Sequence, residues 1–148
     1  MGLAKTRKKM LTLQVGQLTF LAASNAVLGA VTGVMMNITA LVRNMICLKV
    51  KYTLPLKLGI AAILVTLGVC ANDRGIIGML PVAGTLLITL CLDIENIVIL
   101  KTVYILSQCA WIFYDIAVKN YVSAATDAFG ITANIIGIIS VRKHTAKN

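Results

Sequence analysis

The side chains that could do chemistry in this chain are amides and carboxylates lying inside long apolar segments. Asn37 and Asn134 each follow a glycine by four residues, and Asp115 and Asp127 are the only acids well inside such segments. A buried amide can bind a polar solute or a neighbouring helix, because either partner offsets the cost of burial. A buried carboxylate can relay a proton or pair with a cation such as Lys119. Both interpretations stay open for each pair.

Three further positions carry two interpretations each. Trp111 could stack on a solute inside a pocket or belong to an interfacial aromatic belt. Arg43 lies near the end of an apolar segment, where snorkelling to the membrane surface is favoured over an anion site. Pro81 removes a backbone donor within an apolar segment and is predicted to bend its helix.

The residues needed for metal binding, redox reactions or enzymatic catalysis do not occur in suitable patterns. The four cysteines, at positions 47, 70, 91 and 109, form no CxxC pair, and His144 is the only histidine. We therefore expect no metal, no cofactor and no redox reaction. The chain shows no nucleophile–base pair and no phosphate-binding loop, so we expect that it is not an enzyme. Its net charge of +9 is interpreted as a mark of cytoplasmic loops, with no nucleic-acid partner.

The elements that must position these residues are membrane-length helices. Hydrophobic residues make up 59% of the 148 residues and charged residues 13%, and the mean hydropathy is +0.91. The apolar runs have the length of a membrane crossing and no period of two, which favours helices over a barrel. We predict an all-α polytopic membrane protein with six transmembrane helices, at residues 10–28, 30–47, 55–71, 75–92, 97–118 and 121–141.

The distribution of basic residues predicts the orientation. With both termini on one side, that side holds 12 of the 14 Lys and Arg residues, and the other side keeps only Arg74 and Lys119. Cytoplasmic loops are enriched in Lys and Arg. The sequence therefore predicts a multi-pass protein of the cell inner (plasma) membrane with both termini in the cytoplasm, in contact with the lipid bilayer.

A weak internal repeat relates the first two segments to the last two. Gly33 and Asn37 parallel Gly130 and Asn134 at an offset of 97, and Gln17 parallels Gln108 at an offset of 91. The two pairs of segments have the same predicted orientation. Parallel repeats are common in transporters, which bind their substrate between the two halves. The pattern predicts a three-one-three arrangement of helices whose first helix is absent.

Several motifs carry a resemblance to a known family. They are RKKMLTLQ at residues 7–14, LVRN at 41–44, GMLPVAGTL at 78–86, SQCAWIFYDI at 107–116, and residues 134–142. These motifs resemble the bacterial inner-membrane protein YgjV family, which is similar to the SWEET, MtN3 and PQ-loop membrane proteins. The resemblance implies one transmembrane domain over residues 1–148: an incomplete first bundle at 10–48, a linker helix at 55–71 and a three-helix second bundle at 75–141. Members of the family usually carry another helix before Lys8 and Lys9.

The resemblance also implies roles for individual residues. It assigns Asn37, Trp111 and Asn134 to a central substrate pocket and Pro81 to a hinge, although the PQ-loop pair Pro-Gln is Pro81-Val82 here. The predicted topology, rather than the resemblance, places Asp115 and Asp127 toward the outer half, in a possible outer vestibule. The implied function is a SWEET-like transporter of a small, sugar-like solute by alternating access. The alternative is a membrane partner or assembly protein that transports nothing, and association into a homo-oligomer is left open.

Overall fold

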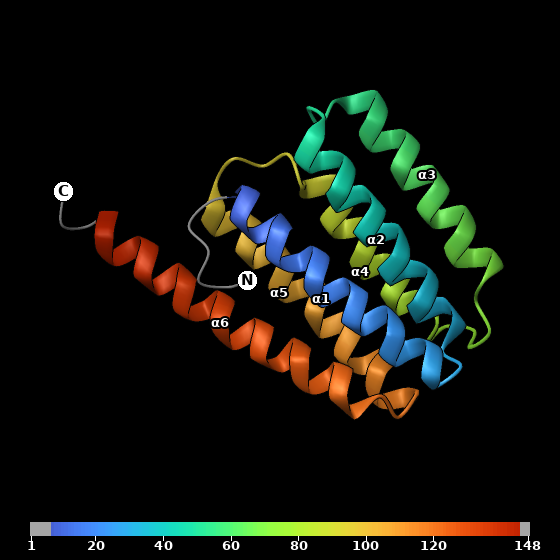
Figure 1. The fold of residues 1–148 in the computed structure, drawn as a ribbon. Helices are drawn as coiled ribbons and strands as arrows, with labels where there is room; N and C mark the ends of the chain where they lie inside the picture. Colours follow the sequence, from blue (N-terminus) through green and yellow to red (C-terminus); the bar gives the residue numbers. More distant parts are fainter. Residues whose placement is uncertain (1–6, 146–148) are drawn as a thin grey trace.

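The computed structural model describes residues 7–145, which form six α-helices and no strand (Figure 1). The helices are α1 (Arg7–Val27), α2 (Val31–Lys49), α3 (Leu54–Cys70), α4 (Met79–Cys91), α5 (Ile97–Ala117) and α6 (Tyr121–Thr145). The all-helical fold predicted from the apolar segments is confirmed. The largest difference at a helix start is in α4, which begins four residues later than predicted because residues 75–78 form a turn.

Three of the described helices are long and apolar enough to cross a membrane. They are α2, α5 and the Tyr121–Lys143 part of α6. The helices α3 and α4 are apolar but shorter, with 17 and 13 residues. At 1.5 Å per residue, α4 is about 20 Å long, which is less than the roughly 30 Å of a hydrocarbon core. Six membrane crossings therefore stay a prediction.

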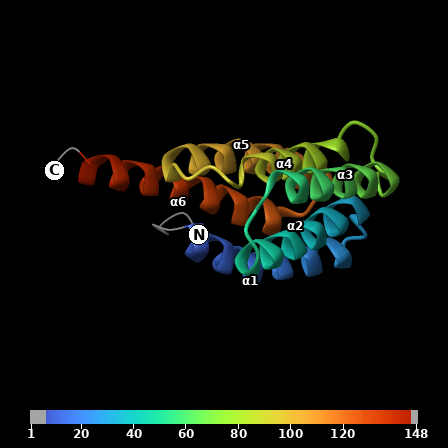
Figure 2. The same ribbon diagram turned by 90° about the horizontal axis from the view of Figure 1, so that it is seen from above.

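The bundle is built from two helical hairpins and two further helices. The helix α1 packs against α2, and α5 packs against α6, while α4 lies against both α5 and α2. The helix α3 covers α4 and α2. Seen from above, α3, α4 and α5 lie in one layer and α1 lies on the opposite side of the bundle (Figure 2). The last turns of α6 extend beyond the ends of the other helices in both views.

The turns of the two hairpins have the same backbone geometry. The residue that ends each turn adopts a left-handed conformation, with φ of 64° at Gly29 and 61° at Lys119. At both turns the next residue donates its N–H to a carbonyl five residues earlier, from Ala30 to Asn25 at 3.0 Å and from Asn120 to Asp115 at 2.7 Å. This is the Schellman arrangement that satisfies the carbonyls at a helix C-terminus.

These turns set a register of 90 residues between the hairpins, not the offsets of 91 and 97 expected from the sequence. In that register Asn37 corresponds to Asp127, and Asn44 corresponds to Asn134. The pairing of Asn37 with Asn134 was therefore wrong for the hairpin turns. The sequence pattern matched glycines in the two hairpins. The second turn, however, carries Lys119 at the left-handed position where the first carries Gly29.

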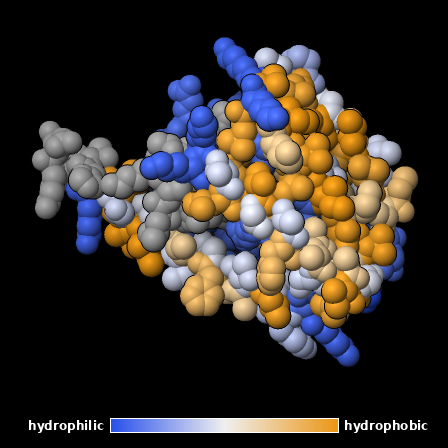
Figure 3. All heavy atoms as spheres, in the orientation of Figure 1, coloured by the Kyte–Doolittle hydropathy of each residue, from blue (hydrophilic) through white to orange (hydrophobic). Residues whose placement is uncertain are grey.

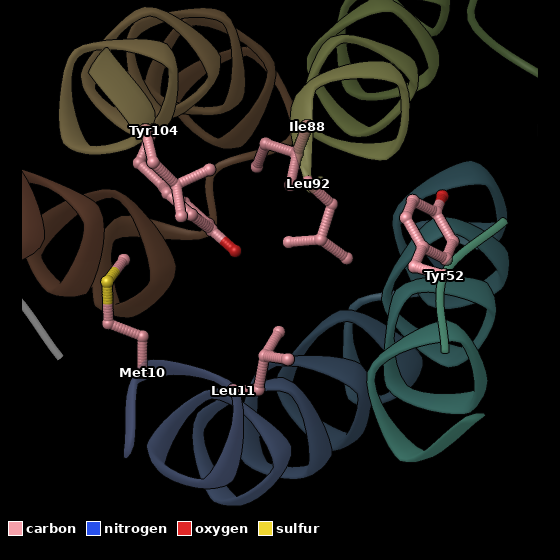
Figure 4. Close-up of a cluster of buried hydrophobic side chains, with 7 residues drawn as sticks. Met10, Leu11, Tyr52, Ile88, Leu92 and Tyr104 are labelled. Carbon is pink, nitrogen blue, oxygen red and sulfur yellow. The ribbon is translucent and has the colours of Figure 1, made fainter. Parts of the chain in front are cut away.

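Two apolar clusters hold the bundle together. One lies away from the hairpin turns and contains Met10, Leu11, Tyr52, Ile88, Leu92, Leu100 and Tyr104; six of these side chains converge from four parts of the chain in Figure 4. The other lies nearer the turns and contains Ala30, Met36, Leu64, Val82, Trp111, Tyr114 and Val118. Outside the core, a broad apolar surface covers α2 and α3, as Figure 3 shows. Such a surface suits contact with lipid.

Candidate functional site

A cavity of about 50 Å³ lies inside the bundle, between the two apolar clusters. Its lining comes from five of the six helices: Gln14, Gln17, Leu18 and Leu21 of α1, Asn37, Ala40 and Arg43 of α2, Thr85 and Ile88 of α4, Tyr104, Ser107, Gln108 and Trp111 of α5, and Asp127 of α6. A void needs roughly 15 Å³ to hold one water, so this cavity has room for a few. Nine of its fourteen lining side chains are polar or charged, or carry a hydroxyl.

The lining is arranged in matched positions of the two hairpins. Ten of the fourteen lining residues form five pairs that are 90 residues apart: Gln14 with Tyr104, Gln17 with Ser107, Leu18 with Gln108, Leu21 with Trp111, and Asn37 with Asp127. The register is the one that the hairpin turns set. Each hairpin contributes one residue of every pair, and α4 covers one side of the cavity with Thr85 and Ile88.

The structure brings two of the three predicted pocket residues into this cavity. Asn37 and Trp111 line it, and Asn134 does not. Asn134 lies further along α6, where its side-chain Nδ2 donates to Gln108 Oε1 over 3.1 Å. Gln108 lines the cavity. Asn134 therefore contacts the cavity only through Gln108, whose amide it orients.

The two buried acids occupy different environments. Asp127 lines the cavity, whereas Asp115 is 0% exposed and neither of its carboxylate oxygens has a hydrogen-bond partner among the described residues. Ser123 of α6 lies next to Asp115. The expected ion pair with Lys119 does not form, because Lys119 is exposed on the turn and lies within 4.0 Å of no described acid.

Pro81 lies in the first turn of α4 and not in the middle of a helix. The first four N–H groups of an α-helix have no partner within the helix, so the proline breaks no helical hydrogen bond. Two turn hydrogen bonds of 3.1 Å precede it, from Met79 N–H to Ile76 O and from Leu80 N–H to Ile77 O. The helix bend expected from an interior proline therefore has no cause at this position.

Arg43 points into the bundle, contrary to the expectation that it would snorkel. It is 2% exposed and lines the cavity. Its Nη1 donates to Thr89 Oγ1 at 2.8 Å and to the Thr85 carbonyl at 3.4 Å. Its Nε and Nη2 donate to Asn44 Oδ1 at 3.1 and 2.9 Å. These partners come from α2 and α4, and they turn the guanidinium inward.

A second layer of hydrogen bonds supports Arg43. Asn44 Nδ2 donates to Gln14 Oε1 at 3.0 Å, and the Tyr104 hydroxyl donates to the same oxygen at 2.7 Å. The network thus links α1, α2, α4 and α5 through side chains that the sequence analysis did not single out. Gln14, Asn44 and Tyr104 are all buried, and fixing them fixes the orientation of the guanidinium.

One amide donor at the cavity has no acceptor among the described residues. It is Asn37 Nδ2, on a side chain that is nearly fully buried. A buried donor that lacks a partner costs about 1–3 kcal/mol. Water or a polar ligand in the cavity would satisfy it, whereas the Gln108 amide lies beside the Asp127 carboxylate. The described residues contain no group of three or more His, Cys, Asp or Glu that could hold a metal ion.

Comparison with known proteins identifies the family of the chain. A family model described as a bacterial inner membrane protein, Imp-YgjV, matches residues 1–145 of the chain. Neither the curated proteins nor the solved structures contain a match.

Proposed function

The chain belongs to the Imp-YgjV family of bacterial inner membrane proteins, and we propose that it is a multi-pass carrier of a small polar solute. In this proposal the six helices cross the membrane and both termini face the cytoplasm. The single observation that carries the proposal is the cavity between the two hairpins and α4, which has nine polar, charged or hydroxyl-bearing side chains in its lining. No enzymatic reaction is part of it.

The energetic argument for a carrier starts from the unpartnered amide of Asn37. A bundle that serves only to hold itself together gains nothing from placing Asn37 where its donor lacks an acceptor. Polar and charged groups inside a membrane are costly, and they commonly mark the path of a substrate. Here such groups converge on one void at the middle of the helices, which is where transporters bind their substrates.

The matched lining supports alternating access. We include the internal repeat in the proposal, with α1–α2 equivalent to α5–α6 in the register of 90 residues. Two equivalent half-sites around one cavity fit a carrier that opens to each side in turn, as parallel-repeat transporters do. The similarity to SWEET proteins belongs to the same proposal.

The cavity is small for a ligand site in this conformation. Binding sites for drug-sized ligands occupy roughly 300–1,000 Å³, and this cavity has about 50 Å³. A carrier would therefore have to widen it to admit a solute. Movement of one hairpin relative to the other would enlarge the space, because the lining is divided between them.

The test is uptake into proteoliposomes that contain the full chain. Uptake of labelled polar solutes, from glycine and glycerol to pentoses and hexoses, is compared with protein-free vesicles. We expect at least one solute to enter faster with the protein, and we expect Gln108→Met, which keeps the volume but removes the amide, to slow that uptake about tenfold or more. The matched control is Thr66→Val, a polar-to-apolar change on the exposed face of α3.

The second candidate function is a membrane partner or assembly protein that moves no solute. The observation in its favour is α6, which exposes Phe129, Ile135, Ile136 and Ile139 and extends past the bundle (Figure 1). Failure of every solute to enter faster than in protein-free vesicles would contradict the carrier and favour this alternative.

A further inference from the structure

We infer that the cavity recognises a small zwitterionic solute, one that carries an anionic and a cationic group in the same molecule. This inference rests on the proposed function and names the class of its substrate. The geometry that points to it is the presence of one guanidinium and one carboxylate, Arg43 and Asp127, in the lining of a single cavity.

Arg43 supplies the half-site for an anion. Every acceptor that it contacts is neutral: the Asn44 side-chain oxygen, the Thr85 carbonyl and the Thr89 hydroxyl. A guanidinium has five N–H donors, and these four contacts leave one N–H for another acceptor. No described acid lies within 4.0 Å of it. A carboxylate in the cavity would complete its hydrogen bonds and compensate its charge.

Asp127 supplies the half-site for a cation. Its side chain is 5% exposed and lies beside the Gln108 amide. No described Lys or Arg lies within 4.0 Å of its carboxylate. An ammonium group would give this carboxylate the positive partner that the described residues do not provide, with donors for its oxygens.

The two half-sites are separated along the bundle. The helices α2 and α6 both start at the hairpin turns, and Arg43 lies twelve residues from the start of α2 whereas Asp127 lies six residues from the start of α6. The difference of six residues corresponds to roughly 9 Å along the helix axes. The two side chains reach the same cavity from different depths, so a solute between them can contact both.

Solutes with other charges fit this cavity less well. A neutral sugar would leave both Arg43 and Asp127 without a counter-charge. A solute with a single charge would leave one of these two residues without a counter-charge. Leaving a buried charge uncompensated is strongly unfavourable. Discrimination arises as much from these penalties as from the contacts with the preferred ligand. The donor of Asn37 adds capacity for the oxygen atoms of a carboxylate.

The first experiment measures binding by the unmodified full chain in detergent. The zwitterions glycine, β-alanine and 4-aminobutyrate vary the separation of the two charges. Their analogues with one charge are acetate, propionate and butyrate on one side and methyl-, ethyl- and propylammonium on the other; acetamide is the neutral analogue. Ligand-induced thermal stabilisation is recorded at equal concentration. We expect one zwitterion to stabilise the protein more than both of its singly charged analogues. If no zwitterion does so, the inference is wrong.

The second experiment assigns the two half-sites. Arg43→Gln should weaken binding of the preferred zwitterion about tenfold or more and leave binding of the alkylammonium analogue unchanged. Asp127→Asn should also weaken binding of the zwitterion about tenfold or more, but leave binding of the carboxylate analogue unchanged. Arg43→Lys keeps the charge and should retain part of the affinity if the variant with glutamine does not fold. The matched controls are Lys49→Gln and Glu95→Gln, which change exposed charges outside the cavity. Equal losses for both analogues in each variant would overturn the assignment.

Uptake separates this inference from the proposed function. A solute that crosses the membrane without preference for a zwitterion contradicts the inference and leaves the carrier intact. Binding of a zwitterion to a protein that moves none of the solutes supports the inference and contradicts the carrier.

Discussion

The hydroxyl oxygen of Tyr114 accepts a hydrogen bond from the backbone N–H of Gly33 over 3.0 Å. Gly33 lies in the first turn of α2, where N–H groups have no partner within the helix. The contact therefore satisfies an N–H that has no helical partner and joins the two hairpins. A side chain at position 33 would collide with Tyr114 and with Asn25, so the glycine is what lets the hydroxyl approach.

Tyr114→Phe should lower the free energy of unfolding by about 1–3 kcal/mol, because the Gly33 N–H stays buried without an acceptor. The ring itself is kept, and so is its edge-to-face contact with Trp111 at 6.1 Å between centroids. Denaturation in detergent measures the change. The control is Tyr121→Phe. Tyr121 is 65% exposed, so removal of its hydroxyl should change the stability little. Equal effects of the two variants would contradict the role of the hydrogen bond.

Asn120→Ala should destabilise the protein more than Asn96→Ala, by at least about 1 kcal/mol. Both asparagines cap the start of a helix. Asn96 is exposed and accepts only from Val98 N–H and Ile99 N–H. Asn120 is buried; it accepts from Ser123 N–H and the Ser24 hydroxyl, and donates to Asn25. The same denaturation assay compares the two variants, and an equal loss would show that the additional hydrogen bonds contribute nothing.

Lys119→Gly should stabilise the protein by about 1 kcal/mol, and Gly29→Ala should destabilise it by a similar amount. Both positions have left-handed backbone, which glycine adopts without strain. No neighbouring atom lies within 4 Å of a Cβ added at Gly29, so the backbone alone accounts for the loss. Gly16→Ala, also without close neighbours but at ordinary φ, is the control. A stabilising Gly29→Ala would contradict the left-handed turn.

Topology is tested with single cysteines in a background that lacks the four native ones. A cysteine at Lys119, on the exposed turn between α5 and α6, should react with a membrane-impermeant thiol reagent added to intact cells. A cysteine at position 148 should react only after the membrane is opened, because basic residues favour the cytoplasmic side. Reaction of the cysteine at position 148 from outside would contradict cytoplasmic termini.

The helices could be predicted from the sequence because their signal is local. Runs of apolar residues broken by short polar turns gave six segments whose ends mostly agree with the structure to within about three residues. The start of α4 was missed because Gly75 and the residues up to Gly78 continue the apolar run while forming a turn. Because the predicted helix began at residue 75, Pro81 was expected in the interior of the helix, whereas it lies in the first turn.

The candidate site could be predicted only in part, because its geometry depends on contacts between distant residues. Asn37 and Trp111 were found from polarity and aromatic character inside apolar segments. Arg43 was assigned to the surface because nothing near it in the sequence shows that Thr89, 46 residues later, accepts its hydrogen bond. The place of Asp127 in the cavity depends on the packing of α6 against α5 and α1, which its local sequence does not show.

The hydrogen bonds around Asn120 and Tyr114 have a mechanical consequence for the whole bundle. They fasten the hairpins to each other at the turn end, with directional bonds from Ser24, Asn25 and Gly33. The opposite end is held by the cluster around Leu92 and Leu100 and by the Tyr104 hydroxyl, which donates to Gln14 of the other hairpin. Three hydrogen bonds therefore join the hairpins at the turn end, and this single bond joins them at the other end. Separation of the hairpins would begin at the end away from the turns, and the Tyr104–Gln14 hydrogen bond would be the first directional contact to break.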